Sequence, residues 1–208
     1  MVLTDDLIRE GWLKTLRIIE AFKRIRRIDF LPPELKNLAH LNEALPIGYG
    51  QTISQPLVVA FMLELLQPKE GEKILDVGAG SGWTTALLSW IVSSNNSSGK
   101  VIAIEKVPEL VDFCKGNIEK YNFIKKGIAK VIYGDGAKGY LKEAPFDKIL
   151  VSASARECYP AWREQLKIGG RIVVPIYNSI WLFVKKNKEE FEEREYPGFS
   201  FVPLITDE

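Results

Sequence analysis

The sequence predicts an α/β fold in which helices cover both faces of a mostly parallel β-sheet. From residue 73 onward, five short apolar runs rich in β-branched residues alternate with helical stretches. Strands that are apolar almost throughout are typical of parallel sheets buried on both faces, and right-handed crossovers connect such strands. The runs occupy residues 73–78, 100–105, 129–135, 146–152 and 171–176.

The length and composition indicate one folded domain with an extension. The chain has 208 residues, of which 46% are hydrophobic and 26% charged, as in ordinary globular proteins. We expect a single domain over residues 1–208. Residues 1–55 should form an N-terminal helical cap and an active-site loop, and residues 56–208 a ligand-binding core with C-terminal strands.

The charge balance and the start of the chain argue against two classes of partner. Lysine and arginine number 28 against 27 acidic residues, and a net charge of +1 gives no basic field for nucleic acid. The first residues are acidic where a signal peptide needs basic ones, and no apolar run approaches the ~18 residues that span a bilayer. We expect a cytoplasmic monomer without nucleic-acid or membrane partners.

The cysteines and the histidine give no sign of a metal site. Cys114 and Cys158 are far apart in the sequence, and His40 is the only histidine. Neither cysteine has a second Cys or His at metal-ligand spacing, so we expect packed, reduced thiols and no metal. A single imidazole also excludes any mechanism that needs two.

The N-terminal region has helical periodicity. Apolar residues within 4–29 recur at spacings of three and four, which predicts one long or two short amphipathic helices. Pro33 opens a further short helix. The turn-rich stretch PIGYGQTISQP, residues 46–56, predicts a loop, and the apolar run from Pro56 to Pro68 predicts a buried helix.

The remaining elements follow the alternating pattern. Helices are expected over residues 83–94, 108–122 and 158–167, and the serines and asparagines of 93–99 predict a flexible loop. After the fifth apolar run, a strand, a charged turn at Lys185–Glu190 and another strand are expected. These two strands should be antiparallel and finish the sheet.

The sharpest functional signal is LDVGAGSGWTTA, residues 75–86, where a strand meets a glycine turn that opens a helix. Gly78, Gly80 and Gly82 let a ligand approach the amides at the helix N-terminus. Dinucleotide folds place the third glycine one position later, and a P-loop would need a lysine that is absent. The G-x-G-x-G form that begins with Asp76 is the one used by methyltransferases that bind S-adenosylmethionine (AdoMet). We therefore predict a Rossmann-like AdoMet-dependent methyltransferase fold, with a purely structural turn as the alternative.

Polar residues at two further strand ends support this prediction. Glu105 lies 23 residues after Gly82, where a carboxylate can accept hydrogen bonds from both ribose hydroxyls. The alternative for Glu105 is an exposed acid at a strand end. Asp135 and Gly136 follow the third strand, where such folds hold the adenine with a carboxylate and an amide. Since the carboxyl ends of parallel strands meet at one crevice, we expect a single site.

Six blocks of sequence resemble the protein-L-isoaspartate (D-aspartate) O-methyltransferase family: LPIGYGQTISQP, EKILDVGAGSGWTTALL, AIEKVPEL, YGDGAKGY, APFDKILVSASA and QLKIGGRIVVPI. The likeness runs from about Asp5 to Leu204, and its GQTIS block is the discriminating one. The resemblance implies methylation of the free α-carboxylate of L-isoaspartyl residues in damaged proteins, with S-adenosyl-L-homocysteine as the second product. The ester would close to a succinimide, which hydrolyses partly to normal aspartate.

The resemblance also implies roles for single residues. Ser54 becomes the active-site serine, which orients the substrate carboxylate; its alternative is an N-cap for the helix that begins at Pro56. No general base is needed, because a carboxylate with a pKa near ~3.5 is already ionised at neutral pH. The cofactor residues are Thr52, Ile53, Asp76, Gly78, Gly80, Gly82, Glu105, Lys106, Asp135 and Gly136.

The chain departs from the family pattern in two places. Asn42 stands where the family commonly has an aspartate, and Ala44 replaces a proline, so a local charge is lost. Residues 152–156 replace a run of alanines followed by proline, and Arg156 there either grips a substrate carboxylate or is simply exposed. Two alternatives stay open: an AdoMet methyltransferase that acts on tRNA or a small metabolite, and a non-catalytic AdoMet-binding relative.

Overall fold

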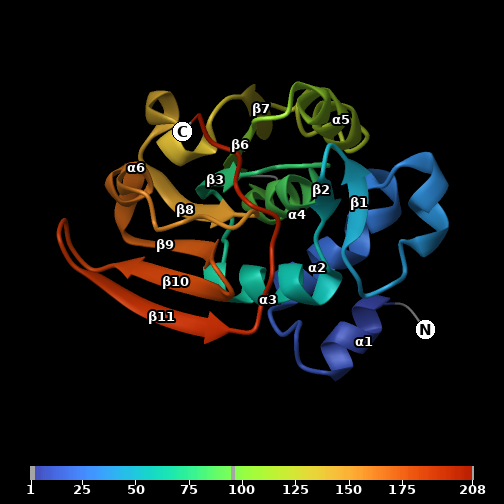
Figure 1. Cartoon of the computed structure of the whole chain (residues 1–208), viewed down its shortest axis with the longest axis horizontal. Coiled ribbons are helices and arrows are strands. Elements are labelled where there is room, and N and C mark those ends of the chain that lie inside the picture. Colours follow the sequence, from blue (N-terminus) through green and yellow to red (C-terminus); the bar gives the residue numbers. More distant parts are fainter. Residues whose placement is uncertain (1–2, 95–96, 208) are drawn as a thin grey trace.

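The computed structural model describes residues 3–94 and 97–207, and its centre is a seven-stranded sheet (Figure 1). Residues 95–96, within the predicted flexible loop, lie outside the described residues, as do residues 1, 2 and 208. The strand order is β11-β10-β9-β8-β3-β6-β7. The strands are β3 (Lys73–Val77), β6 (Lys100–Glu105), β7 (Ala129–Tyr133), β8 (Phe146–Val151), β9 (Leu166–Ile176), β10 (Ser179–Lys185) and β11 (Phe191–Pro197).

The strand directions confirm the predicted sheet. Strands β9, β8, β3, β6 and β7 are mutually parallel, whereas β10 and β11 pair antiparallel at one edge. Strand β9 begins at Leu166, five residues before the predicted run. Its register on β8 shifts within this extra part, which contains Gly169 and Gly170. Because glycine weakens strand propensity, the sequence pattern did not reveal this part of the strand.

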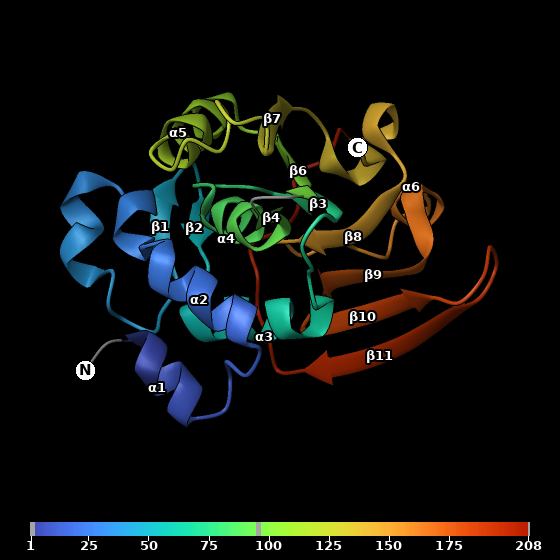
Figure 2. The same cartoon turned by 180° about the vertical axis from the view of Figure 1, so that it is seen from behind.

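Helices cover both faces of the sheet, because alternate residues of each strand point to opposite sides. In β3, Ile74 belongs to the apolar core under α3, α4 and α5, whereas Leu75 and Val77 belong to the core on the opposite face, which contains Trp162 of α6. Figure 2 shows α2, α3 and α4 in front of the sheet. These helices are α2 (Leu16–Arg24), α3 (Pro56–Leu66), α4 (Trp83–Val92), α5 (Pro108–Glu119) and α6 (Pro160–Gln165).

The N-terminal cap consists of two short helices, α1 (Leu3–Arg9) and α2, rather than one long one. A carboxylate of α3 fixes the start of α2. Glu64 accepts hydrogen bonds from the backbone amides of Lys14 and Thr15, both at 2.8 Å, and from the Thr15 hydroxyl at 2.7 Å. An acid at this position satisfies amides that have no partner within the helix, and the helix dipole favours it. The cap is thereby tied to the core.

Short 3₁₀ helices complete the fold. The short helix predicted at Pro33 takes this tighter form, and another 3₁₀ turn directly follows α2. Two more lie between β7 and β8. They are η1 (Arg27–Phe30), η2 (Pro33–Leu38), η3 (Gly136–Lys138) and η4 (Leu141–Glu143).

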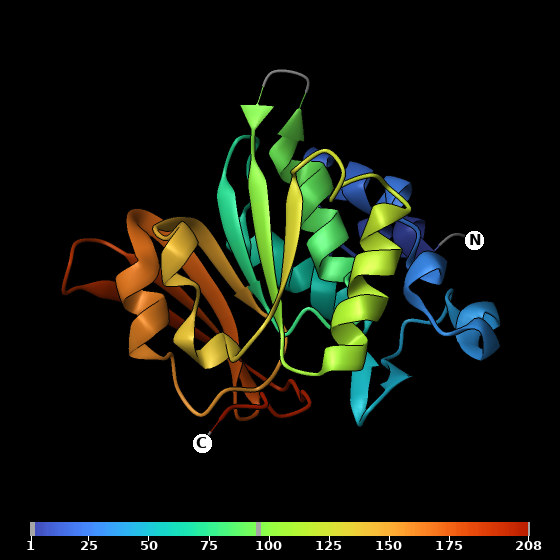
Figure 3. The same ribbon diagram turned by 90° about the horizontal axis from the view of Figure 1, so that it is seen from above.

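Two predicted loops are short hairpins instead. The stretch at 46–56 contains strands β1 (Leu45–Gly48) and β2 (Gln51–Ile53), joined by Tyr49 and Gly50. Both joining residues have positive φ, 54° and 70°, as tight two-residue hairpin turns require. In the serine-rich loop, β4 (Ser93–Ser94) pairs with β5 (Ser97–Ser98). Figure 3 places the β1–β2 hairpin and the C-terminal end at the same end of the sheet, away from β4 and β5.

Candidate active site

The glycine turn lies at the carboxyl end of β3 and leads directly into α4. Gly78, Gly80 and Gly82 have φ angles of 76°, 54° and 87°, in the left-handed region that other residues rarely adopt. The amides of Gly78 and Ala79 donate to the carbonyl of Ile104 in β6, at 2.9 and 3.1 Å. The turn is therefore held in one conformation, which only glycine adopts without strain.

Helix α5 packs closely against the end of this turn. A Cβ atom on Gly82 would lie 2.9 Å from the Sγ atom of Cys114. The buried side-chain amide of Asn117 donates to the carbonyl of Ser81 at 2.9 Å. The third glycine of the motif therefore permits close helix packing.

Glu105 is buried at the end of β6, with 6% of its surface exposed, so the alternative of an exposed acid does not hold. Its Oε2 atom accepts a hydrogen bond from the Gly80 amide at 2.8 Å. Its Oε1 atom accepts from the amides of Lys106 and Val107, at 2.8 and 2.9 Å. A carboxylate oxygen has two lone-pair sites, so Oε2 retains acceptor capacity for a ligand. Glu105 thus shapes the glycine turn and presents a fixed acceptor.

The β1–β2 hairpin packs over the glycine turn. Ile47 and Ile53 are buried, and a Cβ atom on Gly80 would lie 3.3 Å from Cδ1 of Ile47. Thr52 pairs with Pro46 across the hairpin, so the second strand carries Thr52 and Ile53 past the turn and delivers Ser54 directly after it. The GQTIS block is therefore positioned by the pairing of β1 with β2 and by the contact between Ile47 and Gly80.

Ser54 does not cap helix α3, so that alternative is wrong. The N-cap residue is Gln55, whose side chain makes no capping hydrogen bond. Asn42 takes this role instead: its Oδ1 atom accepts from the amide of Leu57 at 3.0 Å, and Gln55 Nε2 donates to the Asn42 carbonyl at 2.9 Å. Within the described residues, the Ser54 hydroxyl has no hydrogen-bond partner. The neutral Asn42 therefore keeps a cap in place although the charge of an aspartate is lost.

A buried arginine holds the segments on both sides of the hairpin. Arg27 in η1 is 6% exposed, and its guanidinium donates to four backbone carbonyls. Its Nε atom has no partner within the described residues. Burial without a carboxylate lowers the pKa of Arg27 to about 10. The four acceptors are the carbonyls of Ala39 (3.4 Å), Leu41 (3.0 Å), Glu43 (2.6 Å) and Ser54 (3.2 Å).

Three adjoining cavities surround these elements, and Thr52 and Ser152 line all of them. With the adjoining open solvent included, the first space measures about 470 Å³, the second about 300 Å³ and the third about 740 Å³. Ser54 lies at the border of the second and third cavities. Of the predicted cofactor residues, the first cavity brings together Thr52, Gly78, Gly80, Glu105, Lys106 and Gly136, and the second brings together Thr52, Ile53, Gly78 and Gly80.

Three predicted cofactor residues line none of these cavities. Gly82 packs on α5, Asp76 is fully buried, and Asp135 lies beside the first cavity, next to Gly136. Arg156 is exposed and lines none of the three cavities, which agrees with its alternative as a surface residue. Ser152, by contrast, lines all three cavities.

Asp76 carries a negative charge behind the glycine turn. Its Oδ2 atom accepts from the hydroxyls of Thr84 and Thr85, at 3.0 and 2.6 Å. Its Oδ1 atom is buried without a partner among the described residues. Burial raises the pKa of Asp76 to about 6, although the two threonine hydroxyls act in the opposite direction. The carboxylate is therefore mainly ionised at neutral pH and favours a cationic ligand nearby.

We expect Asp76→Asn to gain stability relative to the wild type as the pH rises. Because the folded-state pKa of about 6 lies above the reference value of 3.8, the folded protein binds this proton more tightly than the unfolded chain. That contribution is fully present below about pH 4 and is lost as the pH rises through about 6. Urea unfolding of both proteins should show a relative gain of about 3 kcal/mol between about pH 4 and 7. A difference that stays constant with pH would contradict this expectation.

The backbone at the predicted adenine position is tightly packed. Gly136 begins η3, and a Cβ atom there would lie 2.4 Å from Cγ1 of Val77, so the backbone approaches β3 more closely than any other residue allows. The carbonyl of Gly136 accepts from Nε1 of the buried Trp162 at 2.8 Å. Asp135 accepts from the amide of Ala137 at 2.9 Å through Oδ1.

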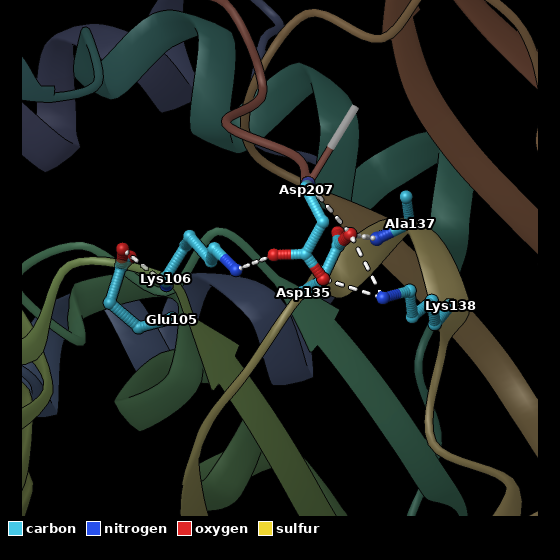
Figure 4. A network of polar contacts seen from close by, with 6 residues as sticks. All are labelled: Glu105, Lys106, Asp135, Ala137, Lys138 and Asp207. Carbon is cyan, nitrogen blue, oxygen red and sulfur yellow. Dashed lines mark hydrogen bonds and ion pairs between the residues drawn. The ribbon is translucent and has the colours of Figure 1, made fainter.

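The C-terminal segment forms the outer wall of the first cavity, which sequence patterns did not predict. Residues 202–205 line this cavity opposite the glycine turn. Beyond them, the amide of Asp207 donates to Oδ2 of Asp135 at 3.0 Å, and the Asp207 carboxylate pairs with the Nζ atoms of Lys106 and Lys138 (Figure 4). The only signal in the sequence was that the family likeness continues to Leu204.

The described residues were also compared with the patterns of metal sites, disulfides and membrane-spanning helices. Among the described residues, no group of three or more His, Cys, Asp or Glu side chains is arranged to hold a metal ion. Cys114 and Cys158 are buried and unpaired, and burial raises the pKa of Cys158 to about 12. In the part of the chain that the structure covers, no helix has the length and apolarity needed to cross a membrane.

Comparisons with known proteins agree on one family. Residues 1–208 match the family described as protein-L-isoaspartate(D-aspartate) O-methyltransferase (PCMT). A protein-L-isoaspartate O-methyltransferase of Methanopyrus kandleri is 41% identical over 210 residues, which cover 99% of this chain and 91% of that protein. The enzyme of the same name from Pyrococcus abyssi is 43% identical, with 97% and 92% covered.

A solved structure shares the fold over nearly the whole chain. It is that of a Plasmodium falciparum protein assigned as a protein-L-isoaspartate O-methyltransferase and crystallised with S-adenosyl-L-homocysteine. The two chains superpose with a TM-score of 0.87 at 25% identity, and the match covers 98% of this chain and 96% of the other.

Proposed function

The chain belongs to the protein-L-isoaspartate(D-aspartate) O-methyltransferase family, and from this premise we propose how its residues perform the reaction. The protein is an AdoMet-dependent enzyme that methylates the free α-carboxylate of L-isoaspartyl residues in damaged proteins. The ester then closes to a succinimide, which starts repair. The observation that carries this function is the family match over residues 1–208, together with relatives about 40% identical that bear the same name.

The first and second cavities suit AdoMet on chemical grounds. Bound AdoMet supplies a sulfonium-activated methyl group. Glu105 offers Oε2 as a fixed acceptor for a ribose hydroxyl, and the Gly136 backbone lines the same cavity at the predicted adenine position. The ionised Asp76 behind the turn complements a positive charge. We assign cofactor contacts to Thr52, Ile53, Gly78, Gly80, Glu105, Lys106, Asp135 and Gly136, and supporting positions to Asp76 and Gly82.

The third cavity suits the methyl acceptor. It is lined by Ala44, Thr52, Ser54 and Ser152 and by residues 200–202, and it shares Thr52, Ser54 and Ser152 with the second cavity. A substrate carboxylate is ionised at neutral pH, so the protein needs no base. Ser54, whose hydroxyl has no other partner among the described residues, donates a hydrogen bond that aims the carboxylate. Hairpin β1–β2 keeps water from the reacting atoms.

The structure argues against the two alternative functions that the sequence left open. A tRNA or small-metabolite methyltransferase would not need the GQTIS block, which here forms an ordered hairpin beside the glycine turn. A non-catalytic relative was suggested by Asn42 and by the changed wall after β8. Asn42 still caps α3, and Arg156 lies outside all three cavities. Ala44 and Ser152 change the lining of the third cavity, but they leave Thr52 and Ser54 in place there.

The direct test is methyl transfer from labelled AdoMet to an isoaspartyl peptide and to its aspartyl twin. We expect base-labile label in the isoaspartyl peptide alone, because only its α-carboxylate is free to accept the methyl group. Equal labelling of the two peptides, or none, would overturn the proposed function. Labelling of tRNA in the same assay would favour the first alternative.

We further propose that the enzyme acts as a cytoplasmic monomer on protein substrates. Two unpaired buried thiols fit a reducing compartment.

A further inference from the structure

The C-terminal segment after β11 runs back across the carboxyl ends of the parallel strands. The Ser154 amide donates to the carbonyl of Val202, and the Leu204 amide donates to the carbonyl of Ser154, both at 2.8 Å. These bonds make a parallel bridge between Ser154 and Pro203. The segment is therefore attached by backbone hydrogen bonds to the wall that follows β8.

The end of the segment contacts residues that follow strands β6 and β7. Lys106 directly follows Glu105 at the end of β6, and Asp135 and Lys138 flank Gly136 beyond β7. Asp207 contacts three residues there: its amide donates to Asp135 and its carboxylate pairs with both lysines (Figure 4). Hydrogen bonds from Lys106 and Lys138 lower the pKa of Asp207 to about 2. The Asp207 carboxylate is therefore ionised at any physiological pH.

We propose that residues 202–207 are part of the cofactor site and that the Asp207 contact with Lys106 and Lys138 sets how fast AdoMet enters and its product leaves. The proposal rests on the proposed function. On this proposal, a ligand that lies between the glycine turn and residues 202–205 is covered by the segment and leaves when the segment moves. Asp207 and Lys138 are 45% and 69% exposed, and exposed ion pairs contribute little stability each. The ion pairs of Asp207 can therefore break without unfolding the sheet.

The test measures release of S-adenosyl-L-homocysteine by stopped-flow fluorescence. In Asp207→Asn the backbone amide remains while the charge is lost, so we expect release to become about 3- to 10-fold faster. Release from the wild type should accelerate with added KCl, and release from the variant should not, because salt screens exposed charges. Lys138→Met should have little further effect in the Asp207→Asn background.

Glu192 in β11 provides a matched control, because its carboxylate also pairs with two exposed cations, those of Lys186 and Arg194. Glu192→Gln should leave release unchanged. Amide hydrogen exchange of residues 202–207 should be faster in Asp207→Asn and unaltered in Glu192→Gln. Unchanged release and exchange in Asp207→Asn, with binding of S-adenosyl-L-homocysteine intact, would overturn this inference alone. A wild type that does not bind S-adenosyl-L-homocysteine would instead overturn the proposed function.

Discussion

Replacing Ser54 by alanine is expected to lower the turnover number for an isoaspartyl peptide by about 10- to 100-fold, with AdoMet affinity changed by less than about twofold. A hydrogen bond to a charged group contributes about 1.5–3 kcal/mol, and this one would act on the acceptor rather than on the cofactor. Ser54 lines both the second and the third cavity. Steady-state kinetics and calorimetric AdoMet titration separate the two effects.

Two variants control for other causes. Ser54→Thr retains a hydroxyl and should recover part of the activity. Ser154→Ala removes a hydroxyl from the neighbouring wall that bonds to the Tyr177 carbonyl at 3.4 Å and lines none of the three cavities, so it should behave as wild type. If Ser54→Ala lost AdoMet binding and kept its turnover number, the serine would have a structural role only.

Replacing Glu105 by alanine is expected to weaken binding of S-adenosyl-L-homocysteine by about 100-fold or more. Two losses combine. The ribose loses a charged acceptor, for which each hydrogen bond contributes about 1.5–3 kcal/mol. The Gly80 amide also loses its partner at 2.8 Å, so the glycine turn keeps only its bonds to the Ile104 carbonyl and is held less firmly. Calorimetric titration of the apoprotein measures this effect without reference to activity.

Glu105→Gln separates these losses. Its amide oxygen still accepts a hydrogen bond but carries no charge, so we expect affinity between those of the wild type and Glu105→Ala. Glu109→Ala, on the exposed first turn of α5, removes a carboxylate from the same segment and should leave binding unchanged. Equal affinity in Glu105→Ala and the wild type would remove Glu105 from the cofactor site.

The fold was predictable to the extent that it depends on local patterns. Strands β3, β6 and β8 are buried along almost their whole length, and apolar runs correctly predicted these strands, the partly exposed β7 and their parallel direction. Hairpin β1–β2 was missed because its strands have only four and three residues, with a proline and a glycine in the first. Such short segments contain too few alternating residues to indicate a strand.

In the candidate site, the residues that the sequence predicted lie inside motifs, whereas residues that contact the site from distant parts of the chain were not predicted. Gly78, Gly80 and Glu105 lie at strand ends, where the fold class itself places a ligand. Arg27 and Asp207 were missed because their roles depend on contacts that join distant parts of the chain: Arg27 reaches the carbonyl of Ser54, and Asp207 reaches Asp135. Neither residue belongs to a local pattern. Only the folded chain shows what surrounds them.

The buried Arg27 guanidinium has a consequence for how the chain can change in length. Surface connections usually tolerate insertions and deletions. Here the carbonyls of residues 39, 41, 43 and 54 must all reach one cation that has no carboxylate partner. A single residue added or removed between residues 39 and 43 changes the spacing of three of these carbonyls, so at least one would turn away and leave the buried charge with fewer acceptors. This stretch should therefore be among the least permissive in the protein for insertions and deletions, although much of it lies at the surface.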